Sequence, residues 1–255
     1  MKISIITVCY NSSATVRETF ESVKAQVYDD IEYIVIDGAS NDGTQQIIEE
    51  YDHIITKWVS ESDNGLYHAM NKGIQLSTGD VIAILNSDDI FRDKHTISIV
   101  AETFAENPTA DSIFADIYYV SQNNTDKIVR NWKSGKQKPF SNGWHPAHPT
   151  FYVKSSFYSR YGLFNLDLKL AADFEIMLRF LERENLSTVY LNQPLVKMRL
   201  GGATNQSLSN IYHQNLECLK AFEINDIRVN KLLYLFYRLL PKLRQFFFDK
   251  KSLNE

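Results

Sequence analysis

The chain has 255 residues, of which 44% are hydrophobic and 23% charged, and its formal net charge is −4 at pH 7. This length fits one large α/β domain or one domain with an appendage, and the apolar content is ordinary for a protein with a core. The only two cysteines, Cys9 and Cys218, argue against a disulfide framework and favour a reducing compartment. With this charge we expect no nucleic-acid partner, and no apolar stretch has the length of a transmembrane helix or the form of a secretion signal.

Short apolar runs bounded by turn signals predict buried strands at residues 3–8, 32–36 and 81–85. A helix follows the first strand, because apolar residues recur there at i, i+4 and i+7 as Val16, Phe20 and Val23. A second helix begins near Asp42, which is placed to cap it. The resulting β-α-β-α-β-α-β order over the first hundred residues predicts an α/β fold with a mostly parallel sheet and helices on both faces.

Acidic residues follow two of these strands directly. Asp88 and Asp89 come after the run 81–85, and Asp37 comes after the run 32–36. In open α/β sheets the carboxyl ends of the strands form the crevice where ligands bind. Adjacent carboxylates repel each other, and a hard cation stabilises such a pair best. The alternative is structural, with Asp88 and Asp89 as a cap for a helix that opens near Asp93.

Five segments in a fixed order carry a family resemblance. They are ITVCYN at 6–11, VIDGASNDGT at 35–44, SESDNGLYHAMNKGI at 60–74, NSDD at 86–89 and AADFEIMLR at 171–179. The first, second and fourth resemble the family 2 glycosyltransferases, which have a GT-A fold (a Rossmann-like sheet). The third and fifth are similar to one bacterial subgroup of that family, which builds O-antigens and other surface polysaccharides.

The resemblance implies a domain plan. It covers about residues 1–204, which we expect to form a GT-A catalytic domain. Within that domain, about 1–100 would be the nucleotide-binding half and about 110–204 the acceptor-binding half. Residues 205–255 would form a C-terminal helical, basic-amphipathic segment.

The resemblance also implies an activity. We expect a metal-dependent, inverting glycosyltransferase that uses Mn²⁺ or Mg²⁺. It would move a hexose or N-acetylhexosamine from a UDP-sugar to a lipid-linked, undecaprenyl-diphosphate oligosaccharide during synthesis of O-antigen lipopolysaccharide or another surface polysaccharide. Its place would be cytoplasmic, peripheral on the inner face of the cell membrane.

Residue roles around the donor follow from the same resemblance. Asp89 is expected to bind the metal and Asp88 to lie near the ribose. Asn86 stands where the fuller pattern has a first Asp, so donor phosphates and water would supply further metal ligands. Asp37 matches the family residue that reads the base, and a carboxylate accepts a hydrogen bond from uracil N3–H but repels cytosine N3. Tyr10 is expected to stack on the base or, alternatively, to be buried structure.

Further donor contacts are expected from residues spread along the chain. Thr7 is a candidate for one more contact in the nucleotide site. Asp63 and Lys72 would face ribose and phosphate, the alternative being a solvated lysine on a helix. His148 matches a histidine of the subgroup and would touch the acceptor or the phosphates, the alternative being a turn residue beside prolines. Arg199, in a segment like the subgroup's closing one, would neutralise the diphosphate, or lie in an ordinary turn.

Asp173 is the candidate general base. It opens a predicted helix with an apolar face, and a helix N-terminus stabilises the ionised carboxylate. It would take the proton of an acceptor hydroxyl that attacks the anomeric carbon opposite the diphosphate, which inverts the configuration. The structural alternative is a simple helix cap.

The tail from Val229 onward is rich in Leu, Phe and Tyr with interspersed Lys and Arg. Such segments lie in the membrane interface, attracted by anionic headgroups. Pro241 would kink or break a helix there. The alternatives are a helix packed on the protein body and a homodimer interface.

Two other functions remain open at this stage. A sugar-phosphate nucleotidyltransferase also combines an α/β nucleotide site with Asp-bound metal, but it has a Gly-rich loop after its first strand, where this chain has none between Tyr10 and Ala14. A non-catalytic, membrane-recruited interaction module on the same fold is disfavoured by the intact Asp37, Asp88, Asp89 and Asp173. Release of UDP would separate these alternatives from a glycosyltransferase.

Overall fold

The structure, a computed structural model, describes residues 1–201 and 208–238. Its centre is a mixed nine-stranded sheet with the order β3-β2-β1-β4-β8-β6-β9-β5, and β7 pairs with β6. The strands are β1 Ile3–Cys9, β2 Ile31–Asp37, β3 Lys57–Ser60, β4 Val81–Ile84, β5 Ile90–Phe91, β6 Ser112–Ser121, β7 Asn124–Trp132, β8 Tyr152–Lys154 and β9 Thr188–Arg199.

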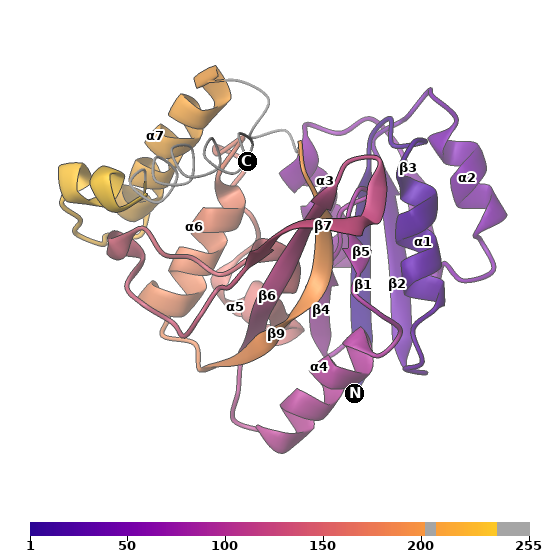
Figure 1. Cartoon of the computed structure of the whole chain (residues 1–255), viewed down its shortest axis with the longest axis horizontal. Coiled ribbons are helices and arrows are strands. Elements are labelled where there is room, and N and C mark those ends of the chain that lie inside the picture. The colour runs from indigo at the N-terminus through magenta and orange to yellow at the C-terminus, as the bar shows by residue number, and fades with distance from the viewer. Residues whose placement is uncertain (202–207, 239–255) are drawn as a thin grey trace, which may run out of the picture.

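Helices cover both faces of this sheet (Figure 1). They are α1 Val16–Lys24, α2 Thr44–Glu50, α3 Leu66–Leu76, α4 Thr96–Glu106, α5 Ser155–Tyr161, α6 Ala172–Leu178 and α7 Leu208–Ile224. Residues 231–238 are also helical. A π-helical turn, Arg179–Arg183, extends α6.

The first hundred residues form the predicted βα repeat. β1 pairs in parallel with β2 and with β4, and β2 pairs in parallel with β3. In the second half, β8 runs antiparallel to β4 and β6, whereas β6 and β9 are parallel. The sheet is therefore parallel where the nucleotide site is predicted and mixed beyond it.

Strand alternation divides the apolar residues between two cores. In β1, Ile3 and Ile5 belong to the core that contains α1, α2 and α4, while Ile6 and Val8 belong to the core that contains α3 and α6. Successive side chains of a strand point to opposite faces, so a strand that is buried on both faces is apolar throughout. This explains why β1 reads as a continuous apolar run.

The polar stretch that follows Ser121 contains a strand. It forms β7, which pairs with β6 in an antiparallel hairpin. No helix among residues 1–201 and 208–238 combines the length and the apolar character required to cross a bilayer.

The C-terminal segment packs onto the body of the protein as far as it is described. α7 lies against α6 (Figure 1), and Cys218 and Phe222 of α7 are fully buried in the core that also holds Phe174. Tyr234 is fully buried as well, with its ring centroid 5.1 Å from that of Phe222. The predicted boundary at residue 204 is therefore no packing boundary, because one apolar core runs across it. The segment from Leu239 onward lies outside the described residues.

A buried carboxylate joins four segments at the amino end of the parallel strands. Glu32 of β2 is 1% exposed and lies 3.4 Å from Lys2 Nζ and 3.5 Å from Lys57 Nζ. It accepts hydrogen bonds from Ser4 Oγ at 2.6 Å and from Thr78, through N at 2.6 Å and Oγ1 at 2.8 Å. Burial alone would raise the pKa of Glu32, but these hydrogen bonds and Lys2 lower it to about 2.

We predict that Glu32→Gln removes much of the acid sensitivity of folding. A folded-state pKa below the unfolded value adds stability above about pH 4.5, and this stability disappears as the pH falls to about 2. The shift corresponds to about 3 kcal/mol. Urea unfolding at pH 7, 4.5 and 2.5 should show a weakened neutral-pH stability and a smaller loss on acidification in the variant.

The matched control is Glu50→Gln. Glu50 is 54% exposed and pairs with Arg17 at 2.7 Å on the surface. Because exposed ion pairs contribute little, this variant should unfold like the wild type across the series. An acid loss in Glu32→Gln equal to that of the wild type would contradict the assignment.

Candidate active site

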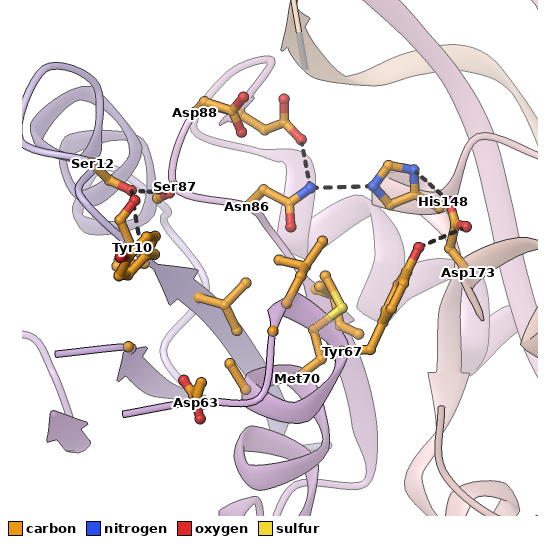
Figure 2. A pocket seen from close by; sticks show the side chains of 18 of the residues that line it. Tyr10, Ser12, Asp63, Tyr67, Met70, Asn86, Ser87, Asp88, His148 and Asp173 are labelled. Atoms are coloured by element: carbon orange, nitrogen blue, oxygen red, sulfur yellow. Dashed lines mark hydrogen bonds and ion pairs between the residues drawn. The ribbon is translucent and has the colours of Figure 1, made fainter. Parts of the chain in front are cut away.

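A cavity of about 860 Å³ opens at the carboxyl edge of the parallel strands. We call it the edge cavity. Its walls come from the turns after β1, β2 and β4, from α3 and α6, and from the end of β9. Figure 2 shows Tyr10 and Asp63 on one side of it, Asp173 and Tyr67 on the other, and Asn86 between them. Segments far apart in sequence therefore share one site.

Asp88 and Asp89 lie in the turn after β4, where the Asp89 amide donates to the Asn86 carbonyl at 3.1 Å. Asp89 is 1% exposed, and its Oδ1 is buried without a hydrogen-bond partner among the described residues. Burial, together with the charge of Asp88, raises the pKa of Asp89 well above its usual range, against the opposing effect of Arg199 and Asn86. A buried carboxylate of this kind needs additional positive charge.

Arg199, at the end of β9, supplies part of that charge. Its side chain is 4% exposed, its Nη1 lies 3.4 Å from the Asp88 carbonyl oxygen, and its Nη2 pairs with Glu18 of α1 at 2.9 Å. Its Nε has no partner among the described residues. Arg199 thus lines the edge cavity beside the two carboxylates, as predicted for a residue that faces an anionic group.

A chain of side chains joins Asp89 to Asp173 (Figure 2). Asn86 Nδ2 lies 3.5 Å from Asp89 Oδ2 and 3.2 Å from His148 Nε2. His148 Nδ1 lies 3.7 Å from Asp173 Oδ2, and Tyr67 donates to Asp173 Oδ1 at 3.1 Å. The metal candidate and the base candidate are therefore two side chains apart.

His148 is neutral in this arrangement. Burial lowers its pKa, although Asp173 and Asp88 act in the opposite direction. The atom of Asn86 that faces the Asp89 carboxylate is the amide nitrogen, so it donates to His148 Nε2. The imidazole proton is thereby assigned to Nδ1, which lies 3.7 Å from Asp173 Oδ2.

Three residues predicted to touch the donor do not line the edge cavity: Thr7, Asp37 and Lys72. Thr7 is fully buried and accepts from Tyr33 Oη at 3.0 Å. Asp37 is also fully buried, and its oxygens accept hydrogen bonds from Ser40 and Ser60. The placement of both residues differs from the expectation because their polar groups are occupied within the protein, Thr7 by Tyr33 and Asp37 by the two serines.

Lys72 is close to the site but does not reach it. Its ammonium pairs with Glu61 at 2.8 Å and with Asp63 Oδ1. These contacts raise the pKa of Lys72 against the effect of burial. Lys72 therefore acts through Asp63, which does line the cavity.

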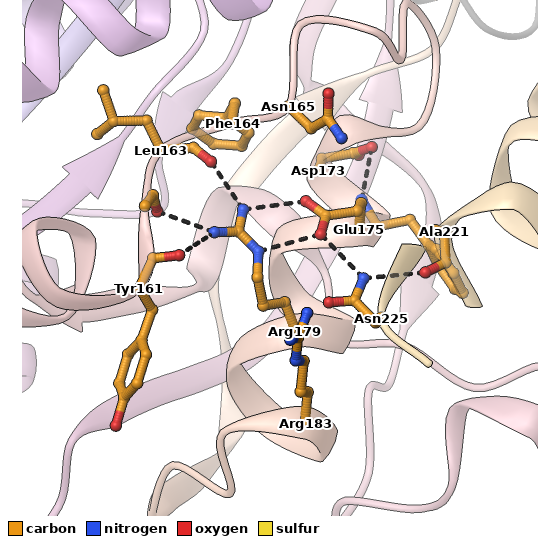
Figure 3. Close-up of polar contacts among 12 residues, drawn as sticks. Tyr161, Leu163, Phe164, Asn165, Asp173, Glu175, Arg179, Arg183, Ala221 and Asn225 are labelled. Carbon is orange, nitrogen blue, oxygen red and sulfur yellow. Dashed lines mark hydrogen bonds and ion pairs between the residues drawn. The ribbon is translucent and has the colours of Figure 1, made fainter. Parts of the chain in front are cut away.

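Asp173 is held by contacts that the sequence did not reveal. Glu175, two residues later, forms a bidentate pair with Arg179 at 3.0 Å for each bond, and Asn225 Nδ2 adds a hydrogen bond to Glu175 Oε1 at 2.9 Å (Figure 3). Arg179 also donates to the carbonyls of Gly162 at 3.1 Å and Leu163 at 2.7 Å. The i,i+4 spacing of Glu175 and Arg179 is the one sequence signal for this network.

α7 supplies a second support through Glu217. Its carboxylate accepts the backbone N–H groups of Lys169 at 3.0 Å, Leu170 at 2.7 Å and Ala171 at 2.9 Å, just before α6. No spacing in the sequence marks this contact. The loop that leads to Asp173 is thus fixed from the C-terminal segment.

The residues present fit a divalent cation that is shared with a ligand. Among the described residues, no group of three or more His, Cys, Asp or Glu is placed to hold a metal ion alone. Asp89 Oδ1 is nevertheless free and buried beside Asp88. Mg²⁺ and Mn²⁺ are commonly bound through one or two carboxylates together with phosphate oxygens and water, which matches this donor set.

Comparison with known proteins gives the family. Residues 4–165 match the model of the family described as glycosyl transferase family 2. The chain belongs to this family. It is similar to the uncharacterized glycosyltransferase Rv1514c of Mycobacterium tuberculosis, with 30% identity over 184 residues that make up 69% of this chain and 68% of the relative. Membership of this family makes the chain a glycosyltransferase and sets aside the nucleotidyltransferase alternative.

Solved structures show the fold. The chain aligns with Staphylococcus aureus TarS at a TM-score of 0.69 and 20% identity, covering 92% of this chain and 41% of TarS. It also aligns with the mannosyltransferase PcManGT of Pyrobaculum calidifontis, solved with GDP-Man and Mn²⁺, at a TM-score of 0.68 and 15% identity, covering 94% of this chain and 69% of that one. The predicted GT-A fold is thereby confirmed.

Proposed function

We propose that this glycosyltransferase moves a hexose or N-acetylhexosamine from a UDP-sugar to a lipid-linked saccharide carried on undecaprenyl diphosphate, in the synthesis of a bacterial surface polysaccharide. The observation that carries the proposal is the edge cavity. It brings Asp88 and Asp89, at the carboxyl edge of the parallel strands, to the same site as Asp173 of α6 (Figure 2). A donor diphosphate and an acceptor hydroxyl would meet between them. A related structure, TarS 1–349, was solved with UDP-GlcNAc.

A divalent cation fits the donor side. Asp89 would hold Mn²⁺ or Mg²⁺ together with donor phosphate oxygens, and the ion would neutralise charge that develops on the leaving diphosphate. Arg199 is placed to add positive charge on the same side. The Mn²⁺ in the related PcManGT structure supports the choice of ion.

Asp173 fits the role of the general base for an inverting displacement. The acceptor oxygen forms the new bond to the anomeric carbon, the bond to the diphosphate breaks, and the hydroxyl proton passes to Asp173. Tyr67 donates a hydrogen bond to Oδ1 of this carboxylate at 3.1 Å. His148 Nδ1 lies 3.7 Å from Oδ2, beyond hydrogen-bond distance, so Oδ2 can still accept the acceptor proton. The side chain is 25% exposed, so an acceptor can reach it.

Substitution of the base should separate binding from chemistry. Asp173→Asn keeps the shape of the side chain and removes its basicity, so transfer should slow by about 10²–10⁴-fold while UDP and metal bind nearly as in the wild type. Single-turnover transfer and calorimetric titration with UDP would measure the two effects. Near-normal transfer would rule out the base role, and lost UDP binding would indicate a structural role.

Substitution of Asp89, the proposed metal ligand, should remove both nucleotide binding that depends on metal and sugar transfer. Asp89→Ala should abolish transfer and the metal-dependent part of UDP binding, because the buried carboxylate is the proposed protein ligand. The control is Asp126→Ala, whose side chain is 92% exposed on β7. Screening UDP-sugars for metal-dependent UDP release would test the donor class, and a wild type that releases no UDP from any of them would count against a UDP-sugar donor.

We further propose that the enzyme docks on the cytoplasmic face of the membrane through its C-terminal end. The helix at 231–238 buries Tyr234 but exposes Leu232 by 82% and Phe236 by 55%. In the sequence this face continues into a stretch that contains Leu, Phe, Lys and Arg, which suits an anionic lipid surface.

Two truncations should distinguish packing from docking. A chain that ends at residue 228 should melt at a lower temperature than the wild type, because it loses the buried Tyr234. A chain that ends at residue 238 should keep its melting temperature and its UDP binding but float less with anionic vesicles. Flotation of the full chain should weaken as salt rises.

Each other outcome has a definite meaning. If the chain ending at 238 floats like the wild type, the segment after residue 238 is not the anchor. If it becomes a monomer where the full chain is a dimer in sedimentation, that segment is a subunit interface.

A further inference from the structure

Asp63 carries an unused hydrogen-bond acceptor at the edge cavity. Its side chain is 8% exposed. Its Oδ1 is occupied by Lys72 Nζ and by His68 Nδ1 at 3.1 Å, whereas its Oδ2 is buried and has no partner among the described residues. A buried carboxylate oxygen without a donor costs free energy, so its retention in a cavity wall points to a donor on a ligand.

Gly38 leaves bare backbone beside that oxygen. A Cβ added at Gly38 would lie 3.5 Å from Asp63 Oδ2 and 3.2 Å from Tyr10 Cδ2. Gly38 does not have a positive φ, so its backbone conformation does not demand glycine. The absence of a side chain at Gly38 therefore leaves room between Tyr10 and Asp63. We call the space bounded by Tyr10, Gly38 and Asp63 the base slot.

Tyr10 makes the base slot suited to a flat ring. The side chain follows β1 and is 70% exposed, so little holds it over Gly38. An exposed aromatic ring offers a face on which a nucleobase can stack. A base stacked there would have its edge directed at Asp63.

Asp37 is in no position to do the same. Its Oδ2 accepts hydrogen bonds from Ser40 N at 3.0 Å and Ser60 Oγ at 2.6 Å, and its Oδ1 accepts from Ser40 Oγ at 2.5 Å. Both oxygens of the Asp37 carboxylate are therefore occupied by hydrogen bonds that stabilise the turn after β2. Asp63, in contrast, lines the edge cavity.

We propose that Asp63 Oδ2, rather than Asp37, reads the nucleobase by accepting its ring N–H. This assignment rests on the proposed use of a uridine donor and names the residue that selects it. Uracil presents one ring N–H, which matches the one free oxygen. Cytosine presents a ring acceptor, which the carboxylate repels, and guanine presents two adjacent donors, which one free oxygen serves less well.

The test is nucleotide discrimination by calorimetry with UDP, CDP and GDP in the presence of Mn²⁺. The wild type should prefer UDP. Asp63→Asn keeps the shape but offers an amide, which can donate to cytosine N3. The ratio of UDP to CDP affinity should therefore fall by about tenfold or more, the usual effect of losing a hydrogen bond to a charged group.

Asp37→Asn is the matched control. It changes the same functional group at the residue that the sequence pattern favours as base reader. Because the Asp37 carboxylate is occupied by hydrogen bonds from Ser40 and Ser60, this variant should lower the melting temperature and weaken UDP and CDP by similar factors. A changed ratio in Asp37→Asn with an unchanged ratio in Asp63→Asn would overturn the inference.

Two further outcomes keep the inference separate from the proposed function. A wild type that binds UDP no better than CDP or GDP overturns the uridine donor itself. If Asp63→Asn does not fold, Gly38→Ala tests the base slot without touching the carboxylate, because its Cβ would crowd Tyr10. Unchanged UDP affinity in a folded Gly38→Ala variant would overturn the base slot.

Discussion

Asp89 is a buried carboxylate beside a second carboxylate, and the groups around it offset the cost of that charge only in part. Arg199 reaches it from the end of β9, Asn86 donates an amide hydrogen, and Glu18 holds Arg199 from α1. β9 belongs to the second half of the sheet, whereas Asp88 and Asp89 follow β4 of the first half. The contact of Arg199 with this acidic turn therefore joins the two halves. The edge cavity exists where they meet, and it leaves Asp89 Oδ1 for a further positive group.

The second half of the site depends on a different kind of support. Asp173 is held indirectly, through the Glu175–Arg179 pair behind it and through Glu217, which holds the loop ahead of it. A buried ion pair is costly unless its hydrogen bonds are satisfied, and here Arg179 also serves carbonyls of the segment after α5. The Asp173 carboxylate is therefore positioned by α6, α7 and the segment after α5 together.

Much of the first half could be predicted from the sequence because periodicity reports burial directly. The apolar run of β1 and the spacing of Val16, Phe20 and Val23 gave the correct elements, since both depend on local geometry. The direction of single side chains at strand ends was harder. Thr7 shares the strand face of Ile5 and Cys9, yet Cys9 lines the cavity and Thr7 does not, so alternation alone does not decide which side chains reach it. Contacts such as that of Glu217 leave no trace in sequence, because they join segments by tertiary packing alone.

The helix at 231–238 is part of the same packed body as the helix that carries Asp173. Tyr234 lies against Phe222, and Arg238 lies over the ring of Phe174 at 5.4 Å. If the exposed side of that helix rests on lipid, the height of the Asp173 carboxylate above the bilayer is set by side-chain packing rather than by a flexible linker. The enzyme would then select its acceptor by length. Saccharides too short or too long to present their terminal hydroxyl at that height would be poor substrates even when their sugars are correct.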